Sequence, residues 1–108
     1  METPKPPRDL SAPTKRWFAS IAATFELEPH HVRLLELAAR AWDRAEQARK
    51  VLAKEGLTVA DRYGQLKPHP CIGIEKDSAI RFARMTRELS LDVSPPDSRP
   101  PRHGGQTY

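Results

Sequence analysis

The side chains best suited to covalent or metal chemistry are the single cysteine, Cys71, and the four histidines. Cys71 lies two residues after His69, and that spacing at a helix start does not bring a base to a thiol. We interpret Cys71 as a small buried apolar residue and His69 as a residue that caps or packs at a helix start. His30 and His31 are adjacent, so they do not face the same way on a helix as a metal-binding pair does.

Sequence motifs that cradle nucleotides or bind catalytic zinc are absent. The chain contains no G-x-x-x-x-G-K-[ST], no G-x-G-x-x-G and no H-E-x-x-H. The sequence therefore predicts no catalytic residue, no metal site and no cofactor, and a hydrolase is the least favoured function.

The other chemistry that the sequence offers is phosphate contact by basic side chains. The formal net charge is +4 and the isoelectric point is about 9.6, with the surplus on the two central helical segments and their connector. Arg33, Arg40 and Arg44 are separated by seven and four residues, which places them on one helix face. A second set, in which successive residues are three apart, is Arg81, Arg84 and Arg87. The candidate DNA-binding residues are Lys15, Arg16, Arg33, Arg40, Arg44, Arg81, Arg84 and Arg87. Each set is equally compatible with a solvated face. Glu36 and Asp43 dilute the first stripe, which favours weak contact without base readout.

Three amphipathic patterns supply the elements that position these residues. Ser11 or Thr14 caps a first helix of about three turns, whose apolar face includes Trp17, Phe18 and Ile21. The second helix is expected from Pro29 to Glu55, with an alanine-rich seam from Leu34 to Leu52 that allows close helix packing. A third is expected from about Pro70 to Leu89, with its seam on Ile72, Glu75, Ala79, Phe82, Thr86 and Leu89.

The segment from Gly56 to Pro70 has neither helical period. Gly56 is placed as a helix C-cap, and the turn signal Asp61–Gly64 predicts a short β-hairpin. Pro68 and Pro70 are expected to end the strand pairing, and Pro70 to begin the third helix. We predict that Gly56, Gly64, His69 and Pro70 act as a structural hinge for oligomerisation.

The fold prediction is all-α: an αα-hairpin plus a third helix, with a small β-hairpin between helices two and three. The 108 residues allow one domain, expected over 11–93, between disordered tails at 1–10 and 94–108. A hydrophobic fraction of 38% is low for a monomer of this size and favours a homo-oligomer. With no secretory signal, no membrane-spanning run and no second cysteine, we expect a soluble intracellular protein.

Six segments, in this order and spacing, resemble a phage terminase small subunit. They are LLELAARAWDRA at 34–45, EGL at 55–57, DRYG at 61–64, KPHP at 67–70, FAR at 82–84 and RELSLD at 87–92. The resemblance spans most of Trp17 to Val93. It implies a non-catalytic, ring-forming protein of the host cytoplasm that binds viral double-stranded DNA and regulates the terminase large subunit, which carries the ATPase and nuclease.

Two other functions remain open on the sequence. The first two helices, joined by Glu26–Glu28, allow a small helix-turn-helix transcription regulator, although a plain αα-hairpin fits better because the turn lacks glycine and is acidic. The second alternative is a helical adaptor that binds only protein, with its charge serving solubility.

Overall fold

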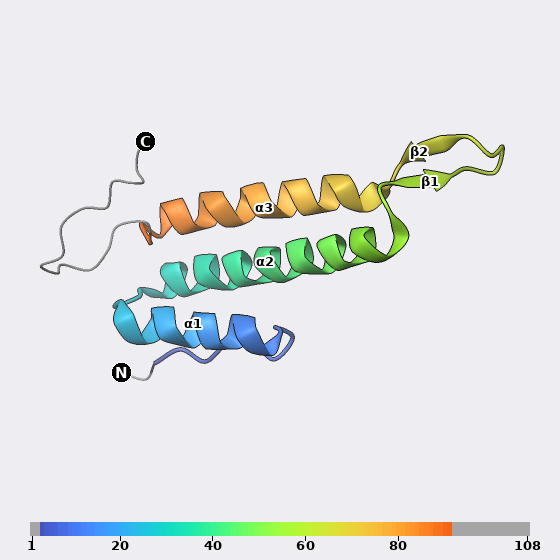
Figure 1. The fold of residues 1–108 in the computed structure, drawn as a ribbon. Coiled ribbons are helices and arrows are strands. Elements are labelled where there is room, and N and C mark those ends of the chain that lie inside the picture. Colours follow the sequence, from blue (N-terminus) through green and yellow to red (C-terminus); the bar gives the residue numbers. More distant parts are fainter. Residues whose placement is uncertain (1–2, 92–108) are drawn as a thin grey trace, which may run out of the picture.

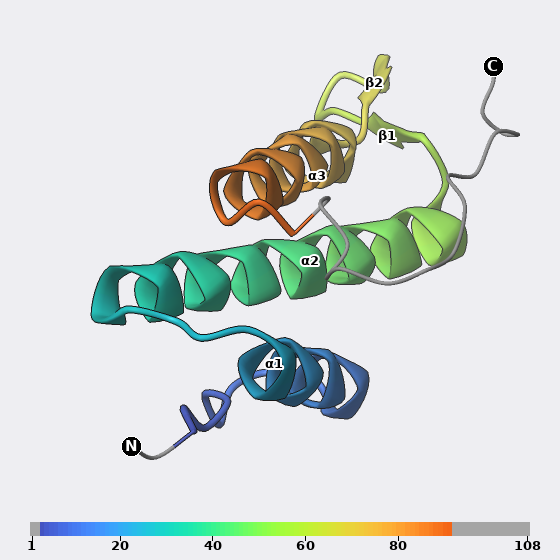
Figure 2. The same cartoon turned by 90° about the vertical axis from the view of Figure 1, so that its left-hand side faces the viewer.

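The chain folds into three helices and one β-hairpin, which confirms the predicted fold class. The computed structural model describes residues 3–91. The elements are α1 (Ala12–Thr24), α2 (Pro29–Glu55), β1 (Thr58–Ala60), β2 (Leu66–Pro68) and α3 (Pro70–Glu88). α2 is the central layer, with α1 on one side and α3 running back along the other (Figure 1). The view turned by 90° shows the same order of layers (Figure 2).

The helix ends follow the capping residues that the sequence offers. Ser11 is the N-cap of α1, and its hydroxyl accepts a hydrogen bond from the Thr14 N–H at 3.4 Å. Pro29 and Pro70 occupy the first positions of α2 and α3, where the missing N–H costs nothing. Gly56 ends α2 at a φ of +88°, which favours glycine, and its N–H donates to the Leu52 carbonyl at 2.8 Å.

The β-hairpin is antiparallel, with Val59 opposite Lys67. One expectation about it was wrong, because Pro68 does not end the pairing. Pro68 lies within β2 opposite Thr58, and the next N–H, that of His69, donates to the Leu57 carbonyl at 2.8 Å. Since hydrogen-bonding residues alternate along a strand, Pro68 falls on the outer edge, where proline is tolerated.

The core lies where α1 meets the first half of α2. Phe18 and Leu35 are fully buried there, and Leu89 and Leu91 from the end of α3 pack against the same cluster. Leu10, which the sequence placed in a disordered tail, belongs to this core and is 5% exposed. Residues 3–10 hold no helix or strand, but Leu10 fastens the segment to the bundle. The predicted tail at 94–108 lies outside the described residues.

The residues that were predicted to pack between α2 and α3 are confirmed on α2, but on α3 a different residue is buried. Ala38, Ala41, Ala48 and Leu52 are buried as predicted. On α3 the buried residue is Ser78, whereas Ile72 and Ile80 of the predicted apolar face are 37% and 42% exposed. A serine opposite alanines keeps the two helices close, so packing places Ser78 inside and leaves larger apolar residues outside.

Candidate nucleic-acid interface

The three arginines of the α2 set lie exposed on one face of that helix. Arg33, Arg40 and Arg44 are separated by seven and four residues, which is close to two turns and one turn. Within residues 3–91, Arg33 and Arg44 make no ion pair closer than 4 Å. Their charges therefore remain available to a polyanion.

Arg40 is engaged by a residue that the sequence did not pair with it. Its Nε donates to Asp9 Oδ2 at 3.1 Å and its Nη2 to Asp9 Oδ1 at 3.4 Å. The Arg40 hydrogen bond is the largest cause that lowers the pKa of Asp9, and the charge of Lys15 adds to it. Both partners are exposed, so a phosphate can replace Asp9 at little cost.

The same flank of α2 continues onto α3. A shallow cleft between the helices is lined by Arg44, Gln47, Ala48, Val51, Cys71 and Ile74. Arg81 lies seven residues after Ile74, hence two turns along the same flank. Arg84 joins it, because Arg81, Arg84, Asp77, Ile80 and Met85 line a second hollow. Arg81 and Arg84 of the α3 set thus lie on the same side of the helix pair as the α2 set.

We call this side the basic face and define it by five arginines and one bordering lysine. Its members are Arg33, Arg40, Arg44, Arg81, Arg84 and Lys15, which borders it through Asp9. Arg16 and Arg87 do not belong to it. Residues in steps of three turn about 60° around a helix, so Arg87 has rotated away from the α2 flank, and Arg16 follows Lys15 on a different side of α1.

Asp43 lies on a different face of α2 from the one that its sequence context predicted. It was expected to dilute the basic stripe, but it is 9% exposed and faces α1. Its carboxylate accepts hydrogen bonds from the Ser11 N–H at 2.7 Å, the Ser11 hydroxyl at 2.9 Å and the Thr14 hydroxyl at 2.5 Å. A carboxylate at the amino end of α1 also suits the helix dipole. The available signal was its spacing, four residues after Ala39 and eight after Leu35 on the apolar stripe.

Of the four residues predicted to form a hinge, Gly56, His69 and Pro70 lie where α2, the hairpin and α3 meet, whereas Gly64 lies at the tip of the hairpin. His69 is buried, its Nδ1 accepts the Cys71 N–H at 3.0 Å, and its Nε2 lies 2.8 Å from Glu55 Oε1. Because Nδ1 accepts, the ring proton sits on Nε2 and is donated to Glu55. His69 thus caps α3, as predicted, and links it to the end of α2. Cys71 was expected to be buried, but it is partly exposed. Gly64, at a φ of +80°, closes the hairpin turn.

The part of the chain that the structure describes lacks the features of two other kinds of site. Among residues 3–91, no three histidine, cysteine, aspartate or glutamate side chains lie together as a possible metal site. Over the same range, none of the helices combines the length and apolarity needed to cross a membrane.

Comparison with known proteins identifies the family. The family model described as phage terminase, small subunit, matches residues 15–99, from the second turn of α1 to beyond the end of α3. No curated protein and no solved structure matches the chain. Because the matched residues make up more than half of the 108, the chain belongs to the family of phage terminase small subunits.

Proposed function

We propose that this chain is the non-catalytic small subunit of a phage terminase, which binds viral double-stranded DNA through the basic face. The proposal is supported by the exposure of the three α2 arginines on one helix face and by the position of Arg81 and Arg84 of α3 on the same side of the helix pair. Guanidinium groups donate to phosphate in a planar fork, so exposed arginines suit the DNA backbone.

The affinity of one chain for DNA is expected to be low. Asp9, Asp77 and Glu88 interrupt the basic face, so few phosphates are neutralised by each copy. A homo-oligomer, which we propose to be a ring, presents several such faces to one duplex and multiplies weak contacts by raising the effective concentration. Binding then depends on backbone charge more than on base sequence.

Within the packaging machine we assign this chain a regulatory part. The large subunit carries the ATPase and nuclease, and the small subunit brings it to viral DNA in the host cytoplasm. We propose that Gly56, His69 and Pro70 set the angle between the helix pair and the hairpin, and that Gly64 shapes the hairpin tip, so that the four residues act together as a hinge. We expect substitutions at the hinge to disturb oligomerisation before they disturb DNA contact.

Light scattering for native mass, followed by DNA binding over a salt series, tests the proposal. A labelled duplex should bind an oligomer with an affinity that falls steeply as salt rises. Changing Arg33, Arg40 and Arg44 together to alanine should weaken binding and flatten the salt slope. A monomer whose DNA binding does not depend on salt would refute the proposal.

A second candidate, a protein-binding adaptor, is favoured by the hairpin. Leu57, Tyr63 and Leu66 are 65%, 78% and 73% exposed, which is unusual for apolar side chains on one short element. An adaptor predicts protein binding with no DNA affinity, whereas a transcription regulator predicts a dimer that is tight on one operator. The same salt series separates all three.

A further inference from the structure

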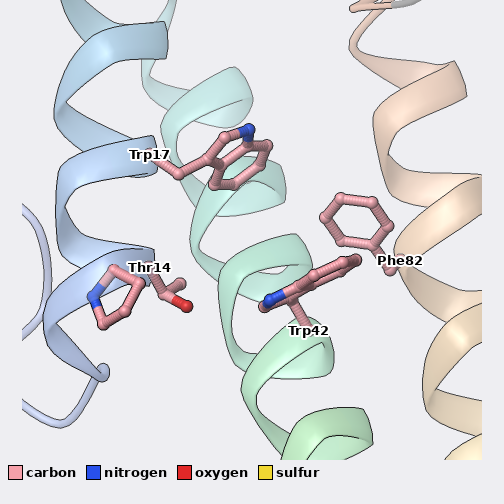
Figure 3. Close-up of a pocket in the computed structure, with 5 residues that line it drawn as sticks. Thr14, Trp17, Trp42 and Phe82 are labelled. Carbon is pink, nitrogen blue, oxygen red and sulfur yellow. The ribbon is translucent and has the colours of Figure 1, made fainter.

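An apolar cavity opens where the three helices meet, on the side of α2 away from the basic face. It has a volume of about 180 Å³ and is lined by Pro13, Thr14, Trp17, Trp42 and Phe82. The aromatic rings come from three different helices and surround the opening (Figure 3). The Phe82 ring centroid lies 5.6 Å from that of Trp17 and 5.0 Å from that of Trp42. Trp42 remains 44% exposed, so the cavity is open to a partner.

The cavity continues into a cleft between α2 and α3 that shares Trp42 and Phe82. The other residues of this cleft are Ala45, Glu46, Arg49, Glu75 and Ala79. We call the cavity and the cleft together the aromatic groove. Glu46 is paired with Arg49, but Glu75 is half-buried and makes no side-chain hydrogen bond or ion pair within residues 3–91. A half-buried carboxylate against an apolar wall is best satisfied by a cation.

The tip of the hairpin has the complementary chemistry. Tyr63 is 78% exposed, and the Arg62 guanidinium carbon lies 5.4 Å from the centre of its ring. The turn is held in shape, because Asp61 accepts the N–H groups of Tyr63 at 2.8 Å and Gln65 at 3.0 Å. A preformed tip loses little conformational entropy when it binds.

The hairpin tip of a chain does not reach the aromatic cavity of the same chain. The strands project beyond the ends of α2 and α3 (Figure 1), whereas Trp42 lies fourteen residues before Gly56 on α2. At a rise of 1.5 Å per residue, that is roughly 20 Å back along the helix. The tip and the groove of one molecule are therefore free to engage other molecules at the same time.

We propose that the hairpin tip of one copy docks in the aromatic groove of a second copy, with Tyr63 in the cavity and Arg62 facing Glu75. This inference deepens the homo-oligomer of the proposed function and rests on it. The contact joins two different surfaces, so it repeats from copy to copy and closes into a ring when the rotation permits.

Two single substitutions at the tip test the contact without touching the core. Tyr63→Ala should weaken self-association about tenfold or more, because buried aromatic anchors dominate interfaces. Arg62→Glu should weaken it through repulsion from Glu75. Leu37→Ala is the control. It removes another exposed apolar side chain, on the flank of α2 opposite the aromatic groove, and should leave the assembly unchanged. Sedimentation velocity over a concentration series measures the effect.

Exchanging the charges of Arg62 and Glu75 tests whether these two residues pair with each other. Glu75→Arg alone should weaken assembly, and the double variant Arg62→Glu/Glu75→Arg should recover part of the loss. The chain has two tryptophans, and both lie in the groove. Their emission should therefore shift to the blue as the wild-type protein assembles, and Tyr63→Ala should reduce that shift.

The outcomes separate this inference from the proposed function. A wild-type protein that is monomeric at all concentrations overturns the inference. An assembly that withstands both Tyr63→Ala and Arg62→Glu also overturns it, and retained salt-dependent DNA binding would then leave the proposed function standing. An assembly that needs Tyr63 but binds no DNA supports the inference and contradicts the DNA-binding part of the proposed function.

Discussion

The two ends of the molecule use their apolar residues in opposite ways. At the three-helix end, Phe18 and Leu35 are fully buried, and α1, α2 and the end of α3 share one core. At the hairpin end, Tyr63 and Leu66 are 78% and 73% exposed. Burial of apolar area is the main source of stability, so the first end holds the fold together. The second end gains little from folding alone and is suited to contact with another molecule.

The largest difference between the ends should appear on truncating an aromatic ring. Phe18→Ala should lower the free energy of unfolding by about 3–5 kcal/mol, because it leaves a cavity in the core. Tyr63→Ala should change it by less than about 0.5 kcal/mol when measured on dilute monomer. Urea denaturation followed by circular dichroism gives both values. Comparable losses for the two variants would refute this division of the molecule.

A substitution at Asp43 tests whether polar contacts also stabilise the three-helix end. Asp43→Ala removes the acceptor shared by Ser11 and Thr14 and leaves their donors unsatisfied near α2. We expect a loss of about 1–3 kcal/mol in the free energy of unfolding. Glu36→Ala, at a nearby half-buried carboxylate of α2, is the matched control and should cost less.

His69 is buried and hydrogen-bonded at the hairpin end of the molecule. His69→Ala removes the cap of α3 and the link to Glu55, which should cost about 0.5–2 kcal/mol. His69→Asn should recover much of that loss, since asparagine is a good N-cap. If asparagine restores nothing, the Glu55 contact matters more than the cap.

The smallest effect concerns the pH response of the hairpin turn. The backbone N–H of Gln65, and then that of Tyr63, hold the pKa of Asp61 below its ordinary value of 3.8. A carboxyl group whose pKa is lowered by folding stabilises the fold above that ordinary value and loses this contribution as the pH falls through the lowered pKa. The amide resonances of Tyr63 and Gln65 should therefore move together below pH 3.8. Asp61→Asn should abolish the transition, and unchanged resonances in the wild type would contradict it.

Local signals in the sequence were enough to predict the elements. Proline at the first position of a helix, glycine after its end and Asp61–Gly64 between two short arms act through the backbone of neighbouring residues. The role of His69 as the cap of α3 was predicted from the same kind of signal.

Contacts between distant residues could not be predicted from those signals. Leu10 joins the core and Asp9 pairs with Arg40 only because the N-terminal segment runs beside α2. The burial of Asp43 needs Ser11, which is 32 residues away in the chain. On α3, the choice of Ser78 over Ile72 as the buried residue depends on the alanines of α2. In each case tertiary packing outweighed local hydropathy.

We propose that DNA is bound by the basic face and not by the overall charge of the chain. The most direct measurement compares two double variants with equal charge loss, Arg33→Ala/Arg44→Ala on the face and Arg16→Ala/Arg87→Ala off it, by the salt dependence of binding to a labelled duplex. We predict that the first pair lowers the slope of log affinity against log salt by about 1.8 per contacting copy, since each phosphate contact contributes about 0.9. The second pair should leave the slope near that of the wild type. Equal slopes for the two variants would show that the basic face has no special part in DNA binding.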